Sequence, residues 1–426
     1  RDGAIRGYRG TVTDITDEVA ALREIDRLAR HDLITGLANR SMLEDYLGSL
    51  IGAIRTQPAA LICIDLDDFK TVNESRGYRA GDLALAEFAD RLQTVLPPNA
   101  FLARVGGDEF AVALPGDDEL HVSRWCENFL SAVEVPIEIE GTDIRLGATA
   151  GIALFPRDAS STGDLLRKAD IALVEAKRRG SYCFFSEDLD QAAIERAQIR
   201  SDLRTAVAKE QFVLHYQPQF DARSLKPTGV EALIRWNHPA RGLVQPSTFI
   251  EAAEESGIIG AIGAWALETA CREIEPFGGL RVSVNVSPIQ IRHQQAFAST
   301  VFHALERTGL APSRLELELT EFALADEIVE SRELFHELRS RGIRLALDDF
   351  GTGYSSLGNL RGFPFDRIKL DQSFVRESEV SASARSIVDA VLRIGHALGM
   401  AVTAEGVETE KQCRELARGG CDEIQG

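Results

Sequence analysis

Two adjacent acids, Asp348 and Asp349, are the residues whose placement points most directly to chemistry. They follow the apolar run 345–347, which is typical of a buried parallel strand, and a turn containing Gly351 and Gly353 comes next. Neighbouring carboxylates repel each other, and one or two divalent cations would relieve that repulsion. The alternative is an Asx-turn in which one acid is solvated.

Further polar residues stand at or near the ends of other predicted strands in the second half of the chain. They are Glu231, Asn285, Glu318, Glu321, Lys369, Glu405 and Gln425. Carboxylates together with an amide oxygen form a hard-oxygen pocket of the kind that Mg²⁺ or Mn²⁺ prefers. A lysine in such a pocket acts electrostatically or positions a water. Separate helix caps and surface acids are the alternative, but they would not favour one rim of a fold.

The elements that must position these residues alternate between strand and helix. Strands are predicted at 212–217, 229–234, 281–285, 315–319, 345–347, 367–370, 401–404 and 421–424, and helices at 247–256, 259–275, 294–308, 324–341, 381–398 and 409–419. Such alternation over about 230 residues predicts a (β/α)8-like barrel, whose active site lies at the carboxyl ends of the strands.

The first half of the chain predicts a separate α/β domain with a mixed sheet. Strands are expected at 59–64, 101–105, 110–114 and 144–154, and helices at 82–96, 121–133 and 164–179. Asp65 follows the first of these strands, and Asp108 and Glu109 stand on a glycine hairpin. Such acids can hold metal ions on a triphosphate and deprotonate an attacking hydroxyl. A solvated acidic hairpin is the alternative.

Composition limits the classes of partner. The formal charge of −19 and the pI near 5.0 argue against nucleic acid or an anionic membrane as partner, but not against small phosphate ligands held through metal ions. The six cysteines include no CxxC pair, which indicates a reducing cytosol and no zinc site. No signal peptide or membrane-spanning run is visible.

Residues 32–186 resemble a GGDEF diguanylate cyclase domain. The resemblance is carried in order by DLITGLANR at 32–40, DLDDFKTVN at 65–73, Gly81-Asp82 and GGDEF at 106–110. It implies condensation of two GTP into cyclic di-GMP across a homodimer. It also implies that Asp65, Asp108 and the Leu66 carbonyl bind metal, Glu109 shares the metal and base work, Asn73 and Asp82 read guanine, and Lys70 and Lys177 contact phosphate.

This domain departs from the family pattern at three places. Residues 97–100 read PPNA where the family has its RxxD product-inhibition motif. Ser181 stands where arginine is usual, and Tyr78 where histidine is usual. A missing phosphate-binding cation would weaken turnover without abolishing GTP binding. The domain is therefore either an active cyclase or a GTP-binding module that regulates its neighbour.

Residues 198–426 resemble an EAL phosphodiesterase domain, which hydrolyses cyclic di-GMP to linear pGpG. The matching motifs are EAL at 231–233, NVS at 285–287, ELTE at 318–321, DDFGTG at 348–353, KLD at 369–371, EGVE at 405–408 and Gln425-Gly426. By resemblance, one metal is held by Glu231, Asn285, Glu318 and Asp348, and a second by Asp348, Asp349 and Glu405. Lys369 orients the water, Gln425 lies near the metals, Gln217 and Arg235 contact the substrate, and Glu321 anchors the loop after Asp349.

The expected organisation has five parts. Residues 1–16 resemble the end of a PAS-like domain, 17–31 form a signalling helix, 32–186 the GGDEF domain, 187–197 a linker helix and 198–426 the EAL domain. The signalling helix either packs on its own domain or forms a coiled coil. The sequence reads as a piece of a longer bacterial cytoplasmic protein, with the EAL end truncated and a membrane anchor conceivable before residue 1. A receptor that binds nucleotides without turnover is the remaining alternative.

Overall fold

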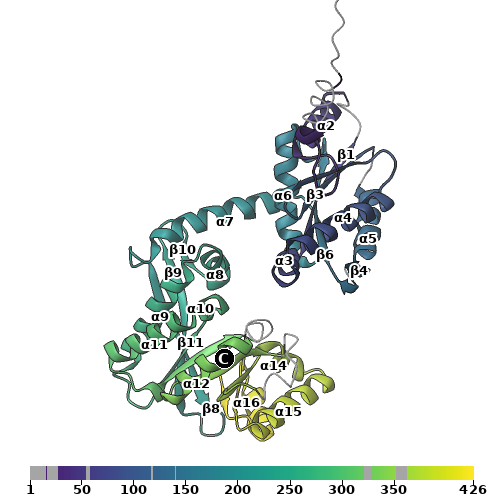
Figure 1. Ribbon diagram of the computed structural model, residues 1–426. Coiled ribbons are helices and arrows are strands. Elements are labelled where there is room, and N and C mark those ends of the chain that lie inside the picture. The colour runs from purple at the N-terminus through teal and green to yellow at the C-terminus, as the bar shows by residue number, and fades with distance from the viewer. Residues whose placement is uncertain are drawn as a thin grey trace, which may run out of the picture. The chain divides into compact units, whose positions relative to one another are not determined.

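The computed structural model describes Thr16 and residues 27–53, 58–116, 119–139, 141–320, 328–351 and 362–426. The chain divides into two compact units, Arg1–Glu195 and Arg196–Gly426 (Figure 1). The predicted PAS-like end and most of the signalling helix lie outside the described residues, as do Glu321 and most of the loop after Asp349. None of the described helices is both long enough and apolar enough to cross a membrane.

The first unit is built on a mixed five-stranded sheet in the order β2-β3-β1-β6-β7, which confirms the predicted class. Its strands are β1 (Ala59–Asp67), β2 (Phe101–Gly106), β3 (Glu109–Pro115), β6 (Gly147–Phe155) and β7 (Tyr182–Phe184), with a small hairpin of β4 (Ile137–Ile139) and β5 (Thr142–Ile144). The predicted strand 144–154 is interrupted at residues 145 and 146, so that its first residue belongs to β5.

Central strand β1 sends alternate side chains to two apolar cores. Ile62 and Ile64 face the core that includes α4 (Tyr78–Val95) and α5 (Glu119–Val133). Leu61 and Cys63 face the core that includes α2 (Arg40–Ala53) and α6 (Thr162–Arg179). The period of two in a strand therefore explains why this strand is apolar throughout. Two helices were not predicted, α2 and α3 (Phe69–Arg76).

Helix α7 (Glu187–Ala206) joins the units without a break in its hydrogen bonding. Its final two turns bury Ile199, Leu203 and Ala206 in an apolar cluster that also contains Phe212 and Trp236 of the second unit. The predicted linker 187–197 is thus the first half of a helix whose second half belongs to the second unit.

The second unit is a closed eight-stranded barrel, as the alternation predicted. Its strands are β8 (Phe212–Asp221), β9 (Pro227–His238), β11 (Arg281–Asn285), β12 (Leu315–Thr320), β13 (Arg344–Phe350), β14 (Arg367–Leu370), β15 (Ala401–Ala404) and β16 (Glu423–Ile424), and β10 (Gly242–Val244) pairs antiparallel with the end of β9. Strand β8 is antiparallel to both β9 and β16, between which it closes the barrel. A turn of only a few residues joins β8 to β9, too few for the crossover that parallel pairing requires.

Helices cover the outside of the barrel (Figure 1). They are α8 (Pro246–Glu255), α9 (Ile259–Ile274), α10 (Pro288–Arg292), α11 (Gln294–Thr308), α12 (Ile328–Ser340), α14 (Gln372–Ser378), α15 (Ala382–Ala397) and α16 (Glu410–Gly419), with a 3-10 turn at Pro312–Arg314. Outward strand residues such as Leu317 and Ile368 join their apolar core. The inward residues between them are polar, whereas barrels of this kind usually fill their interior with branched apolar side chains.

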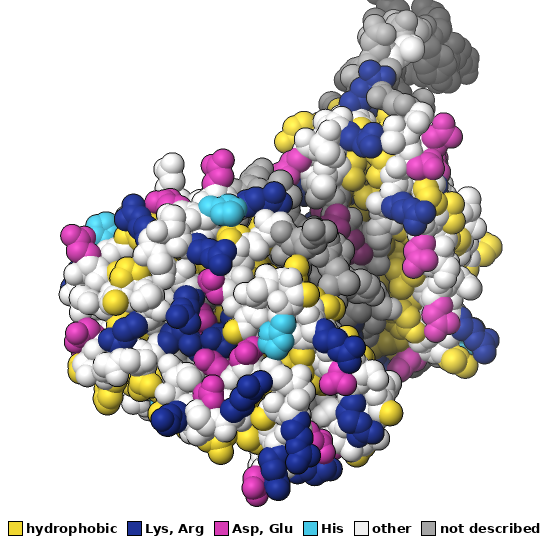
Figure 2. Space-filling view, turned by 90° about the horizontal axis from the view of Figure 1, so that it is seen from below, with side chains coloured by type: hydrophobic (Ala, Val, Ile, Leu, Met, Phe, Trp, Pro, Cys, Tyr) yellow, Lys and Arg dark blue, Asp and Glu magenta, His cyan; other side chains and the backbone are white. Residues whose placement is uncertain are grey.

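The surface mixes charges of both signs. Figure 2 shows Lys and Arg side chains interspersed with Asp and Glu side chains on the face drawn. The net charge of −19 is therefore not gathered into a single acidic patch on this face.

Candidate active site

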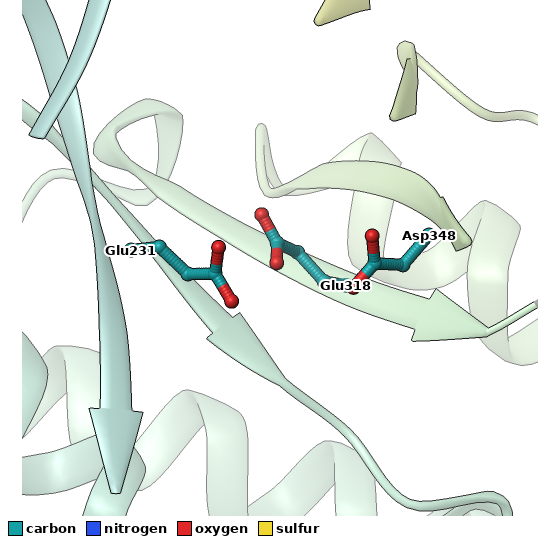
Figure 3. Close-up of side chains that lie close together, drawn as sticks. All are labelled: Glu231, Glu318 and Asp348. Atoms are coloured by element: carbon teal, nitrogen blue, oxygen red, sulfur yellow. The ribbon is translucent and has the colours of Figure 1, made fainter. Parts of the chain in front are cut away.

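Three carboxylates converge inside the barrel at the carboxyl side of its strands. Glu231 extends from β9, Glu318 from β12 and Asp348 from β13 (Figure 3). Each offers an oxygen within 4.8 Å of the others, and a second group of the same kind is formed by Asp348, Asp349 and Glu405. Asp348 belongs to both groups, which makes it a natural bridge between two cations.

Lys369 lies at the centre of these acids. Its Nζ is 3.1 Å from Glu231 Oε2, 2.7 Å from Glu318 Oε2, 3.1 Å from Asp348 Oδ1 and 2.7 Å from Glu405 Oε1. The side chain is only 1% exposed. One buried ammonium thus holds four carboxylates in a compact cluster, where water cannot screen their charges.

Burial and charge together shift the titration of the cluster. Burial raises the pKa of Glu318 well above its usual range against the opposing effect of Lys369, and burial raises the pKa of Glu405 to about 7. For Glu231, burial would raise the pKa, but Lys369 and two amide donors lower it overall. For Lys369, burial would lower the pKa, but Glu318 and the other acids raise it well above its usual value.

Two amides fix the Glu231 carboxylate from opposite oxygens. Asn285 Nδ2 donates to Oε1 at 2.7 Å, and Gln425 Nε2 donates to Oε2 at 2.7 Å. Gln425 Nε2 also donates to Gln217 Oε1 at 3.0 Å, so the residue predicted to contact substrate touches the same cluster. Asn285 was predicted to be a metal ligand, and its bond to Glu231 uses its amide nitrogen rather than its oxygen.

The Asp348–Asp349 pair depends on an unusual backbone. Asp349 N donates to Asp348 Oδ1 at 3.0 Å, and Asp349 itself adopts a φ of 54°. Gly351 follows with a φ of 100°, and a Cβ there would lie 2.7 Å from the Phe374 ring. The register of β13 with β14 therefore shifts between Leu347 and Phe350, and this irregularity lets two adjacent carboxylates belong to one cluster, although adjacent side chains of a regular strand point to opposite faces.

The donor set fits hard divalent cations. Within the described residues, Glu318 Oε1 is buried without a hydrogen-bond donor. Five carboxylates and one ammonium leave an excess of negative charge inside a barrel, which is costly without counter-ions. Oxygen ligands in this number and chemistry suit Mg²⁺ or Mn²⁺.

The position of Glu231 along its strand differs from the prediction. This residue was expected at or near the end of a strand, but it lies well inside β9, which continues to His238, where it pairs with β10. Arg235 lies on the same face of β9, further toward its carboxyl end, and its Nη1 donates to the Ile234 carbonyl at 2.8 Å. Arg235 is partly exposed. Within the described part of the chain, it forms no hydrogen bond or ion pair with the acids of the cluster.

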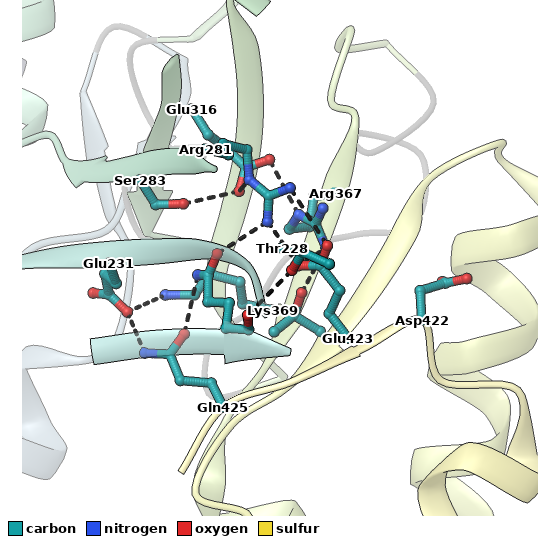
Figure 4. Close-up of polar contacts among 12 residues, drawn as sticks. Thr228, Glu231, Arg281, Ser283, Glu316, Arg367, Lys369, Asp422, Glu423 and Gln425 are labelled. Carbon is teal, nitrogen blue, oxygen red and sulfur yellow. Dashed lines mark hydrogen bonds and ion pairs between the residues drawn. The ribbon is translucent and has the colours of Figure 1, made fainter. Parts of the chain in front are cut away.

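A second polar layer, which was not predicted, lies next to the cluster, nearer the amino ends of the barrel strands (Figure 4). Arg367 Nε donates to Glu316 Oε2 at 3.1 Å, Arg281 Nη2 to Glu423 Oε2 at 2.7 Å, and Arg367 Nη1 lies 2.9 Å from Glu423 Oε2. Each of these residues precedes an upper-layer residue by two or four positions. The alternation LELEL at 315–319 carries this signal, since Glu316 and Glu318 face the same way in a strand.

The candidate site of the first unit is more open. Asp65 on β1 lies opposite Glu109 on β3, and Asp65 Oδ1 is 2.8 Å from Lys177 Nζ. Burial raises the pKa of Asp65, opposed by Lys177, and burial together with Asp65 raises the pKa of Glu109. Among the described residues of this unit, no three acids bring oxygens within 4.8 Å of one another.

The other residues predicted for this site lie around it without joining one cluster. Leu66 N donates to the Asp108 carbonyl at 3.3 Å, which ties β1 to the hairpin. Asn73 packs on Gly81, where a Cβ would lie 2.1 Å from Asn73 Oδ1, so only glycine leaves room for it. Asp82 and Lys70 are exposed, and Lys70 Nζ lies 3.6 Å from Glu74.

Arg104, which was not singled out from the sequence, fixes the GGDEF hairpin. Its Nη2 donates to the Gly107 carbonyl at 2.6 Å, and its Nη1 donates to Asp32 at 2.9 Å. Asp32 also accepts from Thr35 N at 2.8 Å. Asp32 and Arg104 are 72 residues apart in the sequence. One buried guanidinium therefore joins the motif at 32–40 to the hairpin at 106–110.

Comparison with known proteins relates each unit to a family. The family profile described as "EAL domain" matches residues 200–426, and that described as "Diguanylate cyclase, GGDEF domain" matches residues 29–183. An uncharacterized signaling protein of Caulobacter vibrioides is 42% identical over 97% of this chain and 52% of its own length.

Two further relatives carry names with an activity. The bifunctional diguanylate cyclase/cyclic di-GMP phosphodiesterase MucR of Pseudomonas aeruginosa is 38% identical over 96% of this chain and 61% of its own length. A solved structure described as PaMucR phosphodiesterase in complex with c-di-GMP is 39% identical, covers 54% of this chain and 94% of its own, and has a TM-score of 0.52. The chain spans about half the length of the first of these relatives and three fifths of the second.

Proposed function

The chain belongs to the EAL domain family and carries a GGDEF domain before the EAL domain, and on this premise we propose that its second unit hydrolyses cyclic di-GMP to linear pGpG with two Mg²⁺ or Mn²⁺ ions. The observation that carries the proposal is the pair of carboxylate groups that share Asp348 inside the barrel. The names of MucR and of its solved complex support the choice of substrate.

The side chains have distinct parts in this reaction. Glu231, Asn285, Glu318 and Asp348 hold one cation, and Asp348, Asp349 and Glu405 the other. When bound, two metals lower the pKa of a coordinated water and stabilise charge on the phosphate. Burial raises the pKa of Glu318 and that of Glu405, so these two carboxyl groups would have to lose their protons to hold a cation.

Lys369, Gln217 and Arg235 complete the site. Lys369 keeps the four acids together and keeps positive charge beside the reacting phosphate. Gln217 extends from β8 opposite Glu231, where its amide reaches the substrate, and Arg235 binds phosphate or base from the same face of β9.

For the first unit, we propose GTP binding, with Asp65, Asp108 and the Leu66 carbonyl holding the metal. Asn73 and Asp82 read the base, Lys70 and Lys177 contact phosphate, and Glu109 takes part in metal or proton transfer. The open arrangement around Asp65 favours a site completed by its nucleotide and by a second copy of the chain. Synthesis of cyclic di-GMP and regulation by bound GTP are both compatible with it.

Product analysis tests both proposals. The chain is incubated with cyclic di-GMP and Mn²⁺, with GTP and Mg²⁺, and with all four components, and the nucleotides are separated by chromatography. Formation of pGpG is expected. Tight binding of cyclic di-GMP without pGpG would overturn the hydrolytic proposal and favour a receptor. If the Glu231→Gln variant forms cyclic di-GMP from GTP, the first unit is a cyclase. If no cyclic di-GMP forms, but GTP speeds the hydrolysis of cyclic di-GMP by the parent, the first unit is a regulator.

A further inference from the structure

A directional chain of hydrogen bonds runs inside the barrel from Arg281 to Glu231 (Figure 4). Arg281 Nη2 donates to Gln219 Oε1 at 3.0 Å, and Gln219 Nε2 donates to Gln425 Oε1 at 3.0 Å. Gln425 Nε2 then donates to Glu231 Oε2 at 2.7 Å. Gln219 is completely buried, and no side chain in the chain of bonds is exposed by more than a few per cent.

The direction of this chain is set at its Arg281 end. A guanidinium has donors only, so Gln219 must present its oxygen to Arg281. The amide nitrogen of Gln219 then points at Gln425, which must answer with its oxygen. The amide nitrogen of Gln425 is thereby left facing the Glu231 carboxylate. A flip of either amide would place two donors against each other in a buried space, which is costly.

The surroundings hold this arrangement in place. Arg281 is anchored by Glu423 at 2.7 Å, so its donor cannot swing away without breaking a buried ion pair. Gly229 lies two residues before Glu231 on β9, and a Cβ there would lie 3.1 Å from Gln219 Oε1 and 3.0 Å from the Arg281 carbonyl oxygen. The absence of a side chain at this inward position leaves the space that the Gln219 amide occupies.

We propose that Gln219 and Arg281 are positioning residues for the metal centre, acting through Gln425 on the carboxylate of Glu231. Since Asn285 donates to Oε1 and Gln425 donates to Oε2, which also accepts from Lys369, the carboxylate is held against rotation, and Oε1 keeps a lone pair for a cation. The proposal rests on the proposed function only in taking Glu231 as a metal ligand. Neither residue touches substrate or metal.

Isosteric replacement of Gln219 tests this role. Gln219→Glu keeps an acceptor for Arg281 but has no donor for Gln425, and Gln219→Met has neither. Both are made in the full chain with Asp65→Asn, which removes metal binding at the first unit. Mn²⁺ affinity, measured by calorimetry without substrate, is expected to fall by about tenfold in both, the usual effect of losing a group that orients a metal ligand.

A matched control separates positioning from packing. Ser283→Ala removes a buried hydrogen bond to Glu316 in the same layer, at 3.0 Å, but leaves the Gln219 chain intact. Its Mn²⁺ affinity is expected to equal that of the parent. If both Gln219 variants bind Mn²⁺ as tightly as the Ser283 control, the proposal is wrong. A parent that binds Mn²⁺ but yields no pGpG would refute the hydrolytic function alone.

A measurement on the unaltered residue keeps the proposal testable even if the Gln219 variants fail to fold. With ¹⁵N-labelled glutamine, the Gln425 side-chain NH₂ is expected to show slow hydrogen exchange in the metal-free chain, because its nitrogen donates to Gln217 and to Glu231 and its oxygen accepts from Gln219. A Gln425 amide whose hydrogens exchange as fast as those of an exposed glutamine would overturn the proposal. Gln425→Asn identifies the resonance.

Discussion

Both units place a lysine against acids, but the two lysines have very different surroundings. In the barrel, Lys369 is 1% exposed and contacts four carboxylates. In the first unit, Lys177 is 48% exposed and pairs with Asp65. The acids of the barrel form one cluster around their lysine, whereas the acids described in the first unit stay apart. The difference teaches that the same residue types form a compact buried cluster or an open arrangement, according to burial.

The topology of the two sheets explains this contrast. Parallel strands of a closed barrel carry their carboxyl ends to one mouth, so residues from β9, β12, β13 and β14 meet in a small enclosed space. In the first unit, Asp65 and Glu109 lie near the ends of two inner strands of an open sheet, beside a glycine hairpin. An open sheet does not carry further strand ends around these acids to enclose them.

The largest expected effect is the loss of hydrolysis in Glu231→Gln. The change removes one ligand charge without changing size, and metal stabilisation of a phosphoryl reaction is worth several kcal/mol, so pGpG formation should fall by about 10³-fold or more. Chromatography of the products measures it. Asp65→Asn, the matched change in the first unit, should leave hydrolysis intact; equal losses in the two variants would remove the distinction between the sites.

The next largest effect is on stability, in Lys369→Met. Without metal, the buried acids lose their only shared cation, and removing one partner of a buried ion cluster costs about 3–5 kcal/mol. Calorimetry in EDTA should show a lower transition temperature for the barrel. Added Mn²⁺ should raise it more in the variant than in the parent, since cations then replace the ammonium. A transition equal to that of the parent in EDTA would contradict the clustering role.

The matched change in the first unit, Lys177→Met, should cost less than about 1 kcal/mol, because its ion pair is half exposed to water. Calorimetry of this variant beside Lys369→Met compares the two lysines directly. GTP affinity is expected to fall through loss of a phosphate contact. A stability loss as large as that of Lys369→Met would show that the two sites are alike after all.

The smallest effect is a pH dependence of the first unit. Burial would raise the pKa of Asp32, but hydrogen bonds from Thr35 and Arg104 lower it overall. Its contribution to stability is therefore complete above the ordinary pKa of 3.8 and is lost as the pH falls through the lowered value. Asp32→Asn should lack this acid-sensitive part of the unfolding profile. An unchanged profile below pH 4 would exclude the pairing with Arg104 as its source.

Much of the barrel was predictable because its strands are marked locally. Strands β11, β14 and β15 were predicted at their observed bounds. Each is a short run in which apolar residues alternate with polar or small residues, and a loop follows it. The cluster acids followed from the same reasoning, because parallel strands carry their carboxyl ends to one edge. Asp348, Lys369 and Glu405 stand at or near the ends of three successive predicted strands. The order of the strands was therefore enough to predict that they lie close together.

What was missed depends on pairing between distant parts of the chain. Gln219 and Gln425 are 206 residues apart, and they meet because β8, the first strand of the barrel, runs antiparallel beside β16, the last. No local pattern specifies that neighbour. Arg104 escaped notice for the same reason, since a guanidinium within a strand acquires its meaning only from the loop that it contacts.

The left-handed backbone of Asp349 sets stability against activity. A φ of 54° disfavours every residue with a Cβ, and a glycine there would relieve roughly 1 kcal/mol of strain. Selection for thermal stability alone would therefore favour Asp349→Gly, and selection for the proposed hydrolysis would reject it, because the group formed by Asp348, Asp349 and Glu405 would lose one carboxylate. In a library of variants at position 349, the variants that resist heat best should be those with the slowest turnover.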